Sequence, residues 1–222
     1  MRRLLLWLGL AALFAAGAWG ADYVVERAPG AAAPPWSPGS DVSLELKYDS
    51  GTQQYFSGWY TGAGAWVGND FDITMISGFR AVKNIKIYST PSWPNAKWDG
   101  FNVGVYAFAG GRPTSLLWGP TYFKPSRTSP GWVTCPVNWT LPAANNAFVA
   151  AFEQFYNFPN IDPFALDNNG TFVGHSWQYY VGSWSLLTGW GGYRNLMLRV
   201  VVDNTTVVVA PTSLGRVKAL YY

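Results

Sequence analysis

Apolar and polar side chains alternate over several stretches of the chain, and the first of these stretches begins at Val42. There Val42, Leu44 and Leu46 fall on one face, while Glu45 and Lys47 fall on the other. Because successive side chains of a β-strand point to opposite sides of the sheet, this period of two indicates a half-buried strand. We therefore expect the three apolar side chains in the core and the two charged side chains in solvent.

Further strands are predicted wherever the same alternation, or a short apolar run, lies between turn-forming residues. They cover residues 65–73, 82–88, 101–108, 116–123, 132–137, 148–154, 176–181, 196–202 and 205–210. Gly, Pro, Asn and Asp gather between these runs, and helical periodicity is missing after the amino-terminal segment. Many short strands with irregular links favour an all-β fold, namely an antiparallel two-sheet, jelly-roll-like β-sandwich.

The amino-terminal segment has the features of a secretory signal peptide. Arg2 and Arg3 precede an apolar run over residues 4–16, and small residues stand before Ala21, where cleavage is expected. The run is shorter than the roughly 20 residues of a membrane-spanning helix, so no transmembrane anchor is expected in the mature chain. The predicted organisation is a signal peptide (1–20), a Pro/Ala/Gly-rich linker (21–40), a β-sandwich domain (41–203) and a C-terminal strand or tail (204–222). The mature protein is predicted to be secreted and to act in the extracellular space or on the cell surface.

Charge is scarce in this sequence. Charged residues make up 12% of the chain and aromatic residues 18%, so uncharged polar groups and rings must cover much of the surface. Two of the 15 Lys and Arg residues lie in the predicted signal peptide, and the others nearly balance the 12 acids without forming a basic cluster. Nucleic-acid binding is therefore not expected.

The residues of common hydrolytic sites are largely missing. His175 is the one histidine, and the sequence has neither an H-E-x-x-H zinc motif nor a G-x-S-x-G nucleophile motif. Cys135, the one cysteine, excludes an internal disulfide and is expected to be a small buried residue. A glycoside hydrolase needs two carboxylates, and Glu153, at the end of a predicted strand, is the candidate to act with an Asp. No catalytic residue is assigned.

Several acidic residues lie at turns and strand ends, where carboxylates can gather around a cation. Ca²⁺ takes six to eight oxygen ligands from carboxylates, amide side chains and backbone carbonyls. The alternative explanation is turn formation, because Asp and Asn favour turns and no D-x-[DN]-x-[DN]-G loop is present. The candidate ligands of a structural Ca²⁺ are Asp49, Asp70, Asp72, Asp162 and Asp167. No other cofactor is expected.

Aromatic residues in turn-rich segments are the most informative candidates for binding. An exposed, flat ring can hold a sugar ring or an apolar patch of a partner, whereas a ring that closes the end of a sandwich only packs. The candidate ligand-binding residues are Trp93, Trp98, Tyr180, Trp184 and Trp190. The Trp residues inside predicted strands, expected in the core instead, are Trp66, Trp118, Trp132 and Trp177.

The chain also resembles a known class of module. The motifs that carry the resemblance are LKYDSGTQQYFSGWYTGAGAWVGNDFD, VKNIKIYS, WDGFNVGVYAFAGGRPTSLLWGP, GWVTCPVNWT, AFVAAFEQF, HSWQYYVGSWSLL and NLMLRVVVD. Over residues 44–203 they resemble the jelly-roll accessory modules of secreted bacterial peptidases and surface proteins. The end of the chain, APTSLGRVKALYY, resembles the short tails of uncharacterised exported bacterial proteins. The resemblance implies a jelly roll without catalytic residues of its own.

Together these observations predict a secreted, non-catalytic binding module. The expected partner is a carbohydrate or another polymer of the cell envelope, held by aromatic side chains. One alternative is a structural subunit of an extracellular layer or filament, which associates with copies of itself. A glycoside hydrolase-like enzyme is the weaker alternative.

Overall fold

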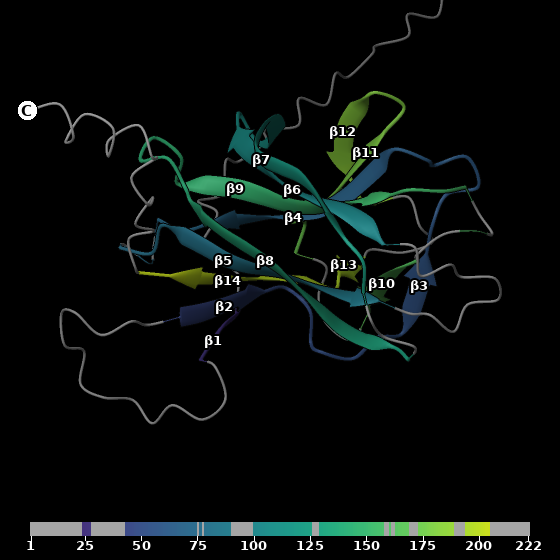
Figure 1. The fold of residues 1–222 in the computed structure, drawn as a ribbon, viewed down its shortest axis with the longest axis horizontal. Helices are drawn as coiled ribbons and strands as arrows, with labels where there is room; N and C mark the ends of the chain where they lie inside the picture. Colours follow the sequence, from purple (N-terminus) through teal and green to yellow (C-terminus); the bar gives the residue numbers. More distant parts are fainter. Residues whose placement is uncertain are drawn as a thin grey trace, which may run out of the picture.

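The computed structural model describes residues 24–27, 43–74, 76, 78–89, 100–125, 129–157, 160, 163–168, 173–188 and 194–204. In this part of the chain every regular element is a β-strand, and the strands form two antiparallel sheets that lie in two layers (Figure 1). None of the described residues belongs to a helix that could cross a membrane. The predicted all-β, antiparallel two-sheet sandwich is therefore confirmed.

Sheet A contains eight strands. Its main path runs β1–β2–β14–β5–β10–β13, while β3 pairs with β10 and β8 pairs with β5. The strands are β1 (Val24–Arg27), β2 (Ser43–Lys47), β3 (Tyr55–Ser57), β5 (Ala81–Ser89), β8 (Gly131–Thr140), β10 (Phe164–Asp167), β13 (Asn195–Leu196) and β14 (Leu198–Asp203). The strand β1 lies within the segment that the sequence assigned to a linker, and it pairs with β2.

Sheet B contains six strands in the order β12–β11–β4–β9–β6–β7. They are β4 (Ala65–Asp72), β6 (Phe101–Ala109), β7 (Arg112–Phe123), β9 (Ala147–Gln154), β11 (Ser176–Tyr180) and β12 (Ser183–Leu186). The β11–β12 hairpin extends the sheet beyond β4, and Figure 1 shows it rising on the far side of sheet B from sheet A.

Eight of the strands follow the jelly-roll order. Neighbours in sheet A are β2, β14, β5 and β8, and neighbours in sheet B are β4, β9, β6 and β7. We number these eight strands 1 to 8 in the order of the chain. Their spatial order is then 1-8-3-6 in sheet A and 2-7-4-5 in sheet B. This is the double Greek-key arrangement of a jelly roll. The chain thus crosses repeatedly between sheets, as the long links in the sequence predict.

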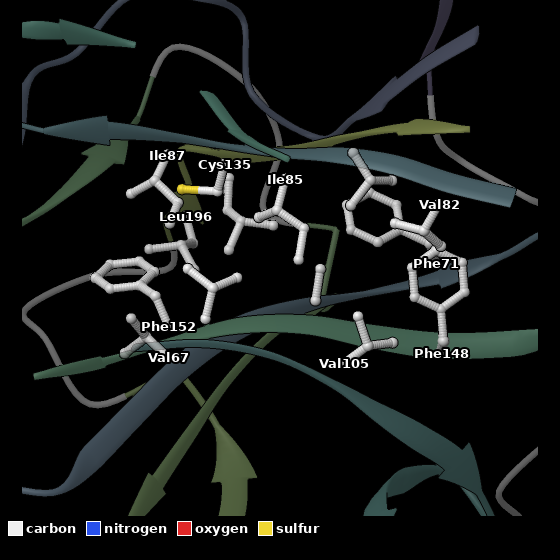
Figure 2. Close-up of a cluster of buried hydrophobic side chains, with 14 of the residues drawn as sticks. Val67, Phe71, Val82, Ile85, Ile87, Val105, Cys135, Phe148, Phe152 and Leu196 are labelled. Carbon is white, nitrogen blue, oxygen red and sulfur yellow. The ribbon is translucent and has the colours of Figure 1, made fainter. Parts of the chain in front are cut away.

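The core lies between the two sheets and is formed by the inward face of each. Figure 2 shows Val82, Ile85, Ile87, Cys135 and Leu196 of sheet A facing Val67, Phe71, Val105, Phe148 and Phe152 of sheet B. The Phe71 and Phe148 rings, both fully buried, have centroids 5.8 Å apart. Cys135 is buried as expected, and burial raises the pKa of its thiol to about 12. The thiol is therefore protonated and unreactive at neutral pH.

The observed strands overlap every predicted strand except 205–210, which lies outside the described residues. The sequence did not predict β3, β10 or β12, which are short and carry no clear alternation. In β2, Leu46 is fully buried as expected and Leu44 is partly buried, while Val42 lies outside the described residues. The prediction that Lys47 is exposed is wrong, because this side chain is only 7% exposed. Its strand is an inner strand of the sheet, paired with β1 on one side and with β14 on the other, so neighbouring strands flank this side chain on both sides.

Candidate functional site

The outer face of sheet B carries a row of side chains that crosses the sheet from edge to edge. The registers of its strands place them in the order Trp184, Tyr179, Trp66, Glu153, Asn102 and Tyr122. We call these six residues the cross-sheet row. Because opposite residues on adjacent strands have their Cβ atoms about 5 Å apart, the row is continuous, with rings at both ends and a polar pair in its second half.

In the neighbouring row on the same face, the positions on β4, β9 and β6 are small residues. Gly68 pairs with Ala151, which pairs on its other side with Gly104. A Cβ at Gly68 would lie 2.4 Å from the carbonyl oxygen of Ala150, and a Cβ at Gly104 would lie 3.3 Å from the Trp66 ring. Because these glycines have no side chains, they leave space in which large aromatic rings lie close to the sheet.

Five aromatic side chains occupy that space. We call Trp66, Tyr106, Phe108, Tyr179 and Trp184 the outer-face aromatic cluster. Tyr106 meets Trp66 edge to face with ring centroids 5.6 Å apart, and it meets Trp184 in the same way at 5.1 Å. Trp184 also contacts Tyr179 at 5.4 Å. Beneath the rings Val149 is fully buried, although it points away from the core between the sheets.

The outer face of sheet B is concave. Trp184 lies on β12 and Tyr106 on β6, which are four strands apart in the order of the sheet. A flat sheet would separate their backbones by about 19 Å, because neighbouring strands lie about 4.8 Å apart. Their ring contact at 5.1 Å requires the sheet to curl, and the edge strands β12 and β7 contact each other accordingly. The aromatic cluster thus lies on the inside of this curl.

Glu153 is the charged member of the cross-sheet row. Its Oε2 accepts a hydrogen bond from Asn102 Nδ2 at 2.6 Å, and its Oε1 lies 3.9 Å from the place of a Cβ at Gly64. Among the described residues, no Lys, Arg or His forms an ion pair with it. Burial raises the pKa of Tyr106 above its ordinary value, and the charge of Glu153 and the Tyr179 hydroxyl add to the effect. The phenol therefore remains a neutral hydrogen-bond donor.

Two grooves flank the row. The first, of about 460 Å³, is lined by Thr61, Gly62, Ala63, Gly64, Ala65, Tyr179, Tyr180, Val181 and Gly182. The second, of about 260 Å³, is lined by Tyr122, Lys124, Phe155 and Tyr156. The first groove meets the cross-sheet row at Tyr179 and the second meets it at Tyr122. The row and the grooves therefore form one surface across the concave face.

The β11–β12 turn beside the first groove has an unusual backbone. Val181 and Gly182 have φ angles of 52° and 79°, both in the left-handed region. A β-branched residue rarely adopts a positive φ, and such residues concentrate at functional sites. Val181 is 84% exposed, so its side chain gains little from packing. The adjacent Tyr180 is held by stacking on Trp59, with ring centroids 5.5 Å apart.

The structure brings together part of the predicted aromatic site. Trp184 and Tyr180 lie on the same hairpin, but Trp184 joins the aromatic cluster whereas Tyr180 points to the opposite face and the first groove. Trp93, Trp98 and Trp190 lie outside the described residues.

The candidate calcium ligands fall into two separate places. Asp49 and Asp167 lie at the turn after β2, where they accept hydrogen bonds from the backbone N–H groups of Gly51 and Ser50. Asp70 and Asp72 lie on β4 of the other sheet. Asp162 lies outside the described residues. Within the described ranges, no three His, Cys, Asp or Glu side chains are grouped as metal ligands. The calcium site stays a prediction.

The outer face of sheet A carries a network of paired charges. Arg199 binds Asp49 through Nε and Nη2, at 3.0 Å and 2.5 Å, and binds Glu45 through Nη1 at 2.8 Å. Lys86 forms a second ion pair with Glu45. The Arg199 guanidinium also lies over the Trp132 ring, 4.1 Å from its centroid. Glu45 is accordingly only partly exposed rather than in open solvent, because two cations cover its carboxylate.

Asp70 does not provide a second catalytic carboxylate for Glu153. Trp177 Nε1 donates to Asp70 Oδ1 at 2.5 Å, and His175 Nδ1 lies 2.8 Å from Asp70 Oδ2. Glu153 pairs with Trp66, four residues before Asp70 on β4, so the two acids are about 13 Å apart along the strand. The carboxylates of glycoside hydrolases are about 5–10 Å apart. This geometry gives no support to the hydrolase alternative.

Sequence reasoning missed most of the concave face. It placed Trp66 and Trp177 in the core, and both are buried, with 9% and 8% exposed. Their burial, however, comes from other rings on the outer face: Tyr106 contacts Trp66, and Phe108 contacts Trp177. The sequence did contain a signal, because Gly68 and Gly104 interrupt two apolar strands, and a glycine inside a strand often marks a close approach.

The fold and the surface thus define a jelly-roll β-sandwich with an aromatic, weakly charged concave face. Comparison of the chain with known protein families, with curated proteins and with solved structures gave no match.

Proposed function

We propose that the protein is a non-catalytic binding module that holds a carbohydrate polymer along the concave face of sheet B. The observation that carries the proposal is the cross-sheet row, in which rings on both sides flank the hydrogen-bonded pair of Glu153 and Asn102. Sugar rings offer apolar C–H faces and hydroxyl groups at their edges. A surface that combines aromatic rings with a few placed polar groups can contact both.

The shape of the site favours an extended ligand over a small molecule. The row crosses all six strands of sheet B, and a groove opens beside each end of it. Both grooves are open surface features lined largely by Tyr side chains and loop backbone. A chain of several sugar units would contact the partly exposed rings of Trp184, Tyr179 and Tyr122 and leave through either groove.

The composition of the chain agrees with this proposal. A secreted module that binds a neutral or weakly charged polymer needs few surface charges, and charged residues make up only 12% of the chain. The resemblance to jelly-roll accessory modules points in the same direction, because such modules work without catalytic residues. The proposed place of action is the extracellular space or the cell surface.

A glycan array followed by calorimetric titration tests the proposal. The secreted form of the wild type should bind at least one class of polysaccharide as a monomer. Tyr122→Ala should weaken that binding roughly tenfold or more, because truncation of a ring in a binding hot spot costs at least about 1–2 kcal/mol. The matched control is Tyr55→Ala, since Tyr55 lies on sheet A and is 42% exposed, close to the 52% of Tyr122.

The alternative, a structural subunit, predicts a different result. Size-exclusion chromatography with light scattering would then show particles that grow with protein concentration, whether or not a glycan is present. An empty glycan array together with such growth would replace our proposal by this alternative.

A further inference from the structure

We propose that the concave face selects a polysaccharide that carries protonated amines, that is, a polymer of de-N-acetylated amino sugars. This inference rests on the proposed function and adds to it the charge of the ligand. Its basis is the position of Glu153, a carboxylate on a largely aromatic surface that has no cationic partner among the residues the structure describes.

Glu153 differs in its partners from Glu45 and Asp49 on sheet A, and also from Asp70 on sheet B, which pairs with His175. On sheet A, Glu45 is paired with both Lys86 and Arg199, and Asp49 is paired with Arg199. On sheet B, Glu153 accepts one hydrogen bond, from the neutral Asn102, and among the described residues no cation pairs with it. A partly buried carboxylate gains most from a partner that brings a positive charge.

The surroundings of Glu153 favour a cation in particular. Trp66 is its neighbour in the register of β4 and β9, and the Tyr106 hydroxyl is close enough to Glu153 for its charge to act on the phenol. The faces of aromatic rings attract cations, by about 0.5–2 kcal/mol for each favourable contact. A carboxylate next to several rings is therefore a site suited to an ammonium group.

The free carboxylate oxygen also has access to the ligand. Oε1 of Glu153 lies 3.9 Å from the place of a Cβ at Gly64, and Gly64 lines the first groove. Because Gly64 has no side chain, nothing at that position separates Glu153 from the groove. A sugar amine that enters along the cross-sheet row can reach this oxygen while its ring contacts Tyr179.

The test compares two hexamers that differ only in acetylation, hexa-glucosamine and hexa-N-acetylglucosamine. Calorimetry is run at about pH 5.5, above the ordinary pKa of a Glu carboxyl group and below that of an amine. The wild type should bind the free-amine hexamer roughly tenfold more tightly, as one charge-assisted contact at a partly exposed site implies. The preference should shrink as salt is added, because salt screens the charge pair.

Glu153→Gln should abolish this preference while its thermal unfolding curve stays close to that of the wild type. The matched control is Asp72→Asn, which removes one exposed carboxylate from the same face of the same sheet and should leave the preference intact. Asn102→Lys provides a second variant, because an internal ammonium beside Glu153 should compete with the ligand and also remove the preference.

Equal affinity of the wild type for both hexamers would overturn the inference, and so would a preference that survives in Glu153→Gln. If the array shows binding to neutral glycans alone, the inference fails and the proposed function stands. If no glycan binds, both fail.

Discussion

The outer faces of the two sheets are covered by different kinds of side chains. On sheet A, charged side chains cover the strands, and Arg199 satisfies Asp49 and Glu45 while it lies over Trp132. On sheet B, aromatic rings cover a row of small residues, and Glu153, the carboxylate of the cross-sheet row, has no cationic partner in the described part of the chain.

On sheet A the polar groups are satisfied by one another, whereas on sheet B some groups remain able to contact a ligand. A buried ion pair stabilises the fold only while both partners are present, and it offers nothing to a ligand. Partly exposed rings and an unpaired carboxylate contribute less to the fold and retain the capacity to bind. We therefore expect substitutions of the charged residues on sheet A to affect stability, and substitutions of Glu153 and the partly exposed rings on sheet B to affect binding.

Arg199→Ala should give the largest effect on stability. It would leave Asp49, whose side chain is fully buried, without its cation. Breaking a buried ion pair from one side costs about 3–5 kcal/mol. Urea unfolding of this variant should show that loss, whereas Glu153→Gln on sheet B should stay within about 0.5 kcal/mol of the wild type. Similar losses of unfolding free energy in both variants would contradict the proposed difference between the two outer faces.

Gly68→Ala should cause the next largest loss of stability, and it tests the row of small residues beneath the rings. Its Cβ would lie 2.4 Å from a backbone oxygen, so the sheet itself must move. Overpacking of this kind costs about 1–3 kcal/mol. Gly104→Ala is the matched control, since its closest contact is a Leu116 methyl at 3.1 Å, and a side chain yields more easily than a backbone. Equal losses of thermal stability in the two variants would show that the row of small residues is less tightly packed at Gly68 than we describe.

Trp184→Ala and Trp132→Ala compare two partly exposed Trp side chains on opposite outer faces. Trp184→Ala should cost about 2 kcal/mol or more of glycan-binding energy, the size expected for a binding hot spot. Trp132→Ala should leave binding unchanged. Calorimetric titration checks both variants, and a loss of affinity in Trp132→Ala would place the ligand on sheet A.

The pH dependence of stability should give the smallest effect. Burial raises the pKa of Glu45, but hydrogen bonds and charge from Lys86 and Arg199 outweigh it, so the pKa lies below its ordinary value of 4.5. A depressed carboxyl pKa stabilises the fold above the unfolded-state pKa, and this stabilisation is lost as the pH falls through the folded-state pKa. Glu45→Gln should therefore flatten the acid limb of the unfolding free energy plotted against pH. An unchanged acid limb would show that Glu45 is not stabilised as a charged group.

The sequence predicted the fold well because period-two alternation determines which residues share a face of a strand. It could not say which face lies between the sheets, since both faces of β4 and β9 are apolar: Phe71 is in the core, and Trp66 is outside it. The short strand β12 has the sequence SWSL, too brief for a pattern, so Trp184 was assigned to a loop.

Long-range partners were equally hidden from sequence reasoning. Asp49 and Arg199 lie 150 residues apart in the chain and meet only because β2 pairs with β14. Asp49 was therefore predicted as a calcium ligand, whereas its observed partner is a guanidinium. Glu153 was singled out as an acid at a strand end, but its setting among Trp66, Tyr106 and Asn102 depends on registers that no local pattern encodes.

The most direct test of the account is a nuclear magnetic resonance titration of the isotope-labelled secreted protein with hexa-glucosamine, following the indole N–H signals of Trp. Binding on the concave face should shift the signals of Trp66 and Trp184, on the outer face of sheet B, and leave that of Trp132 on sheet A in place. Shifts confined to Trp132 would contradict the assignment of sheet B as the binding face, and no shift of any indole signal at saturating hexamer would contradict the inferred free-amine ligand.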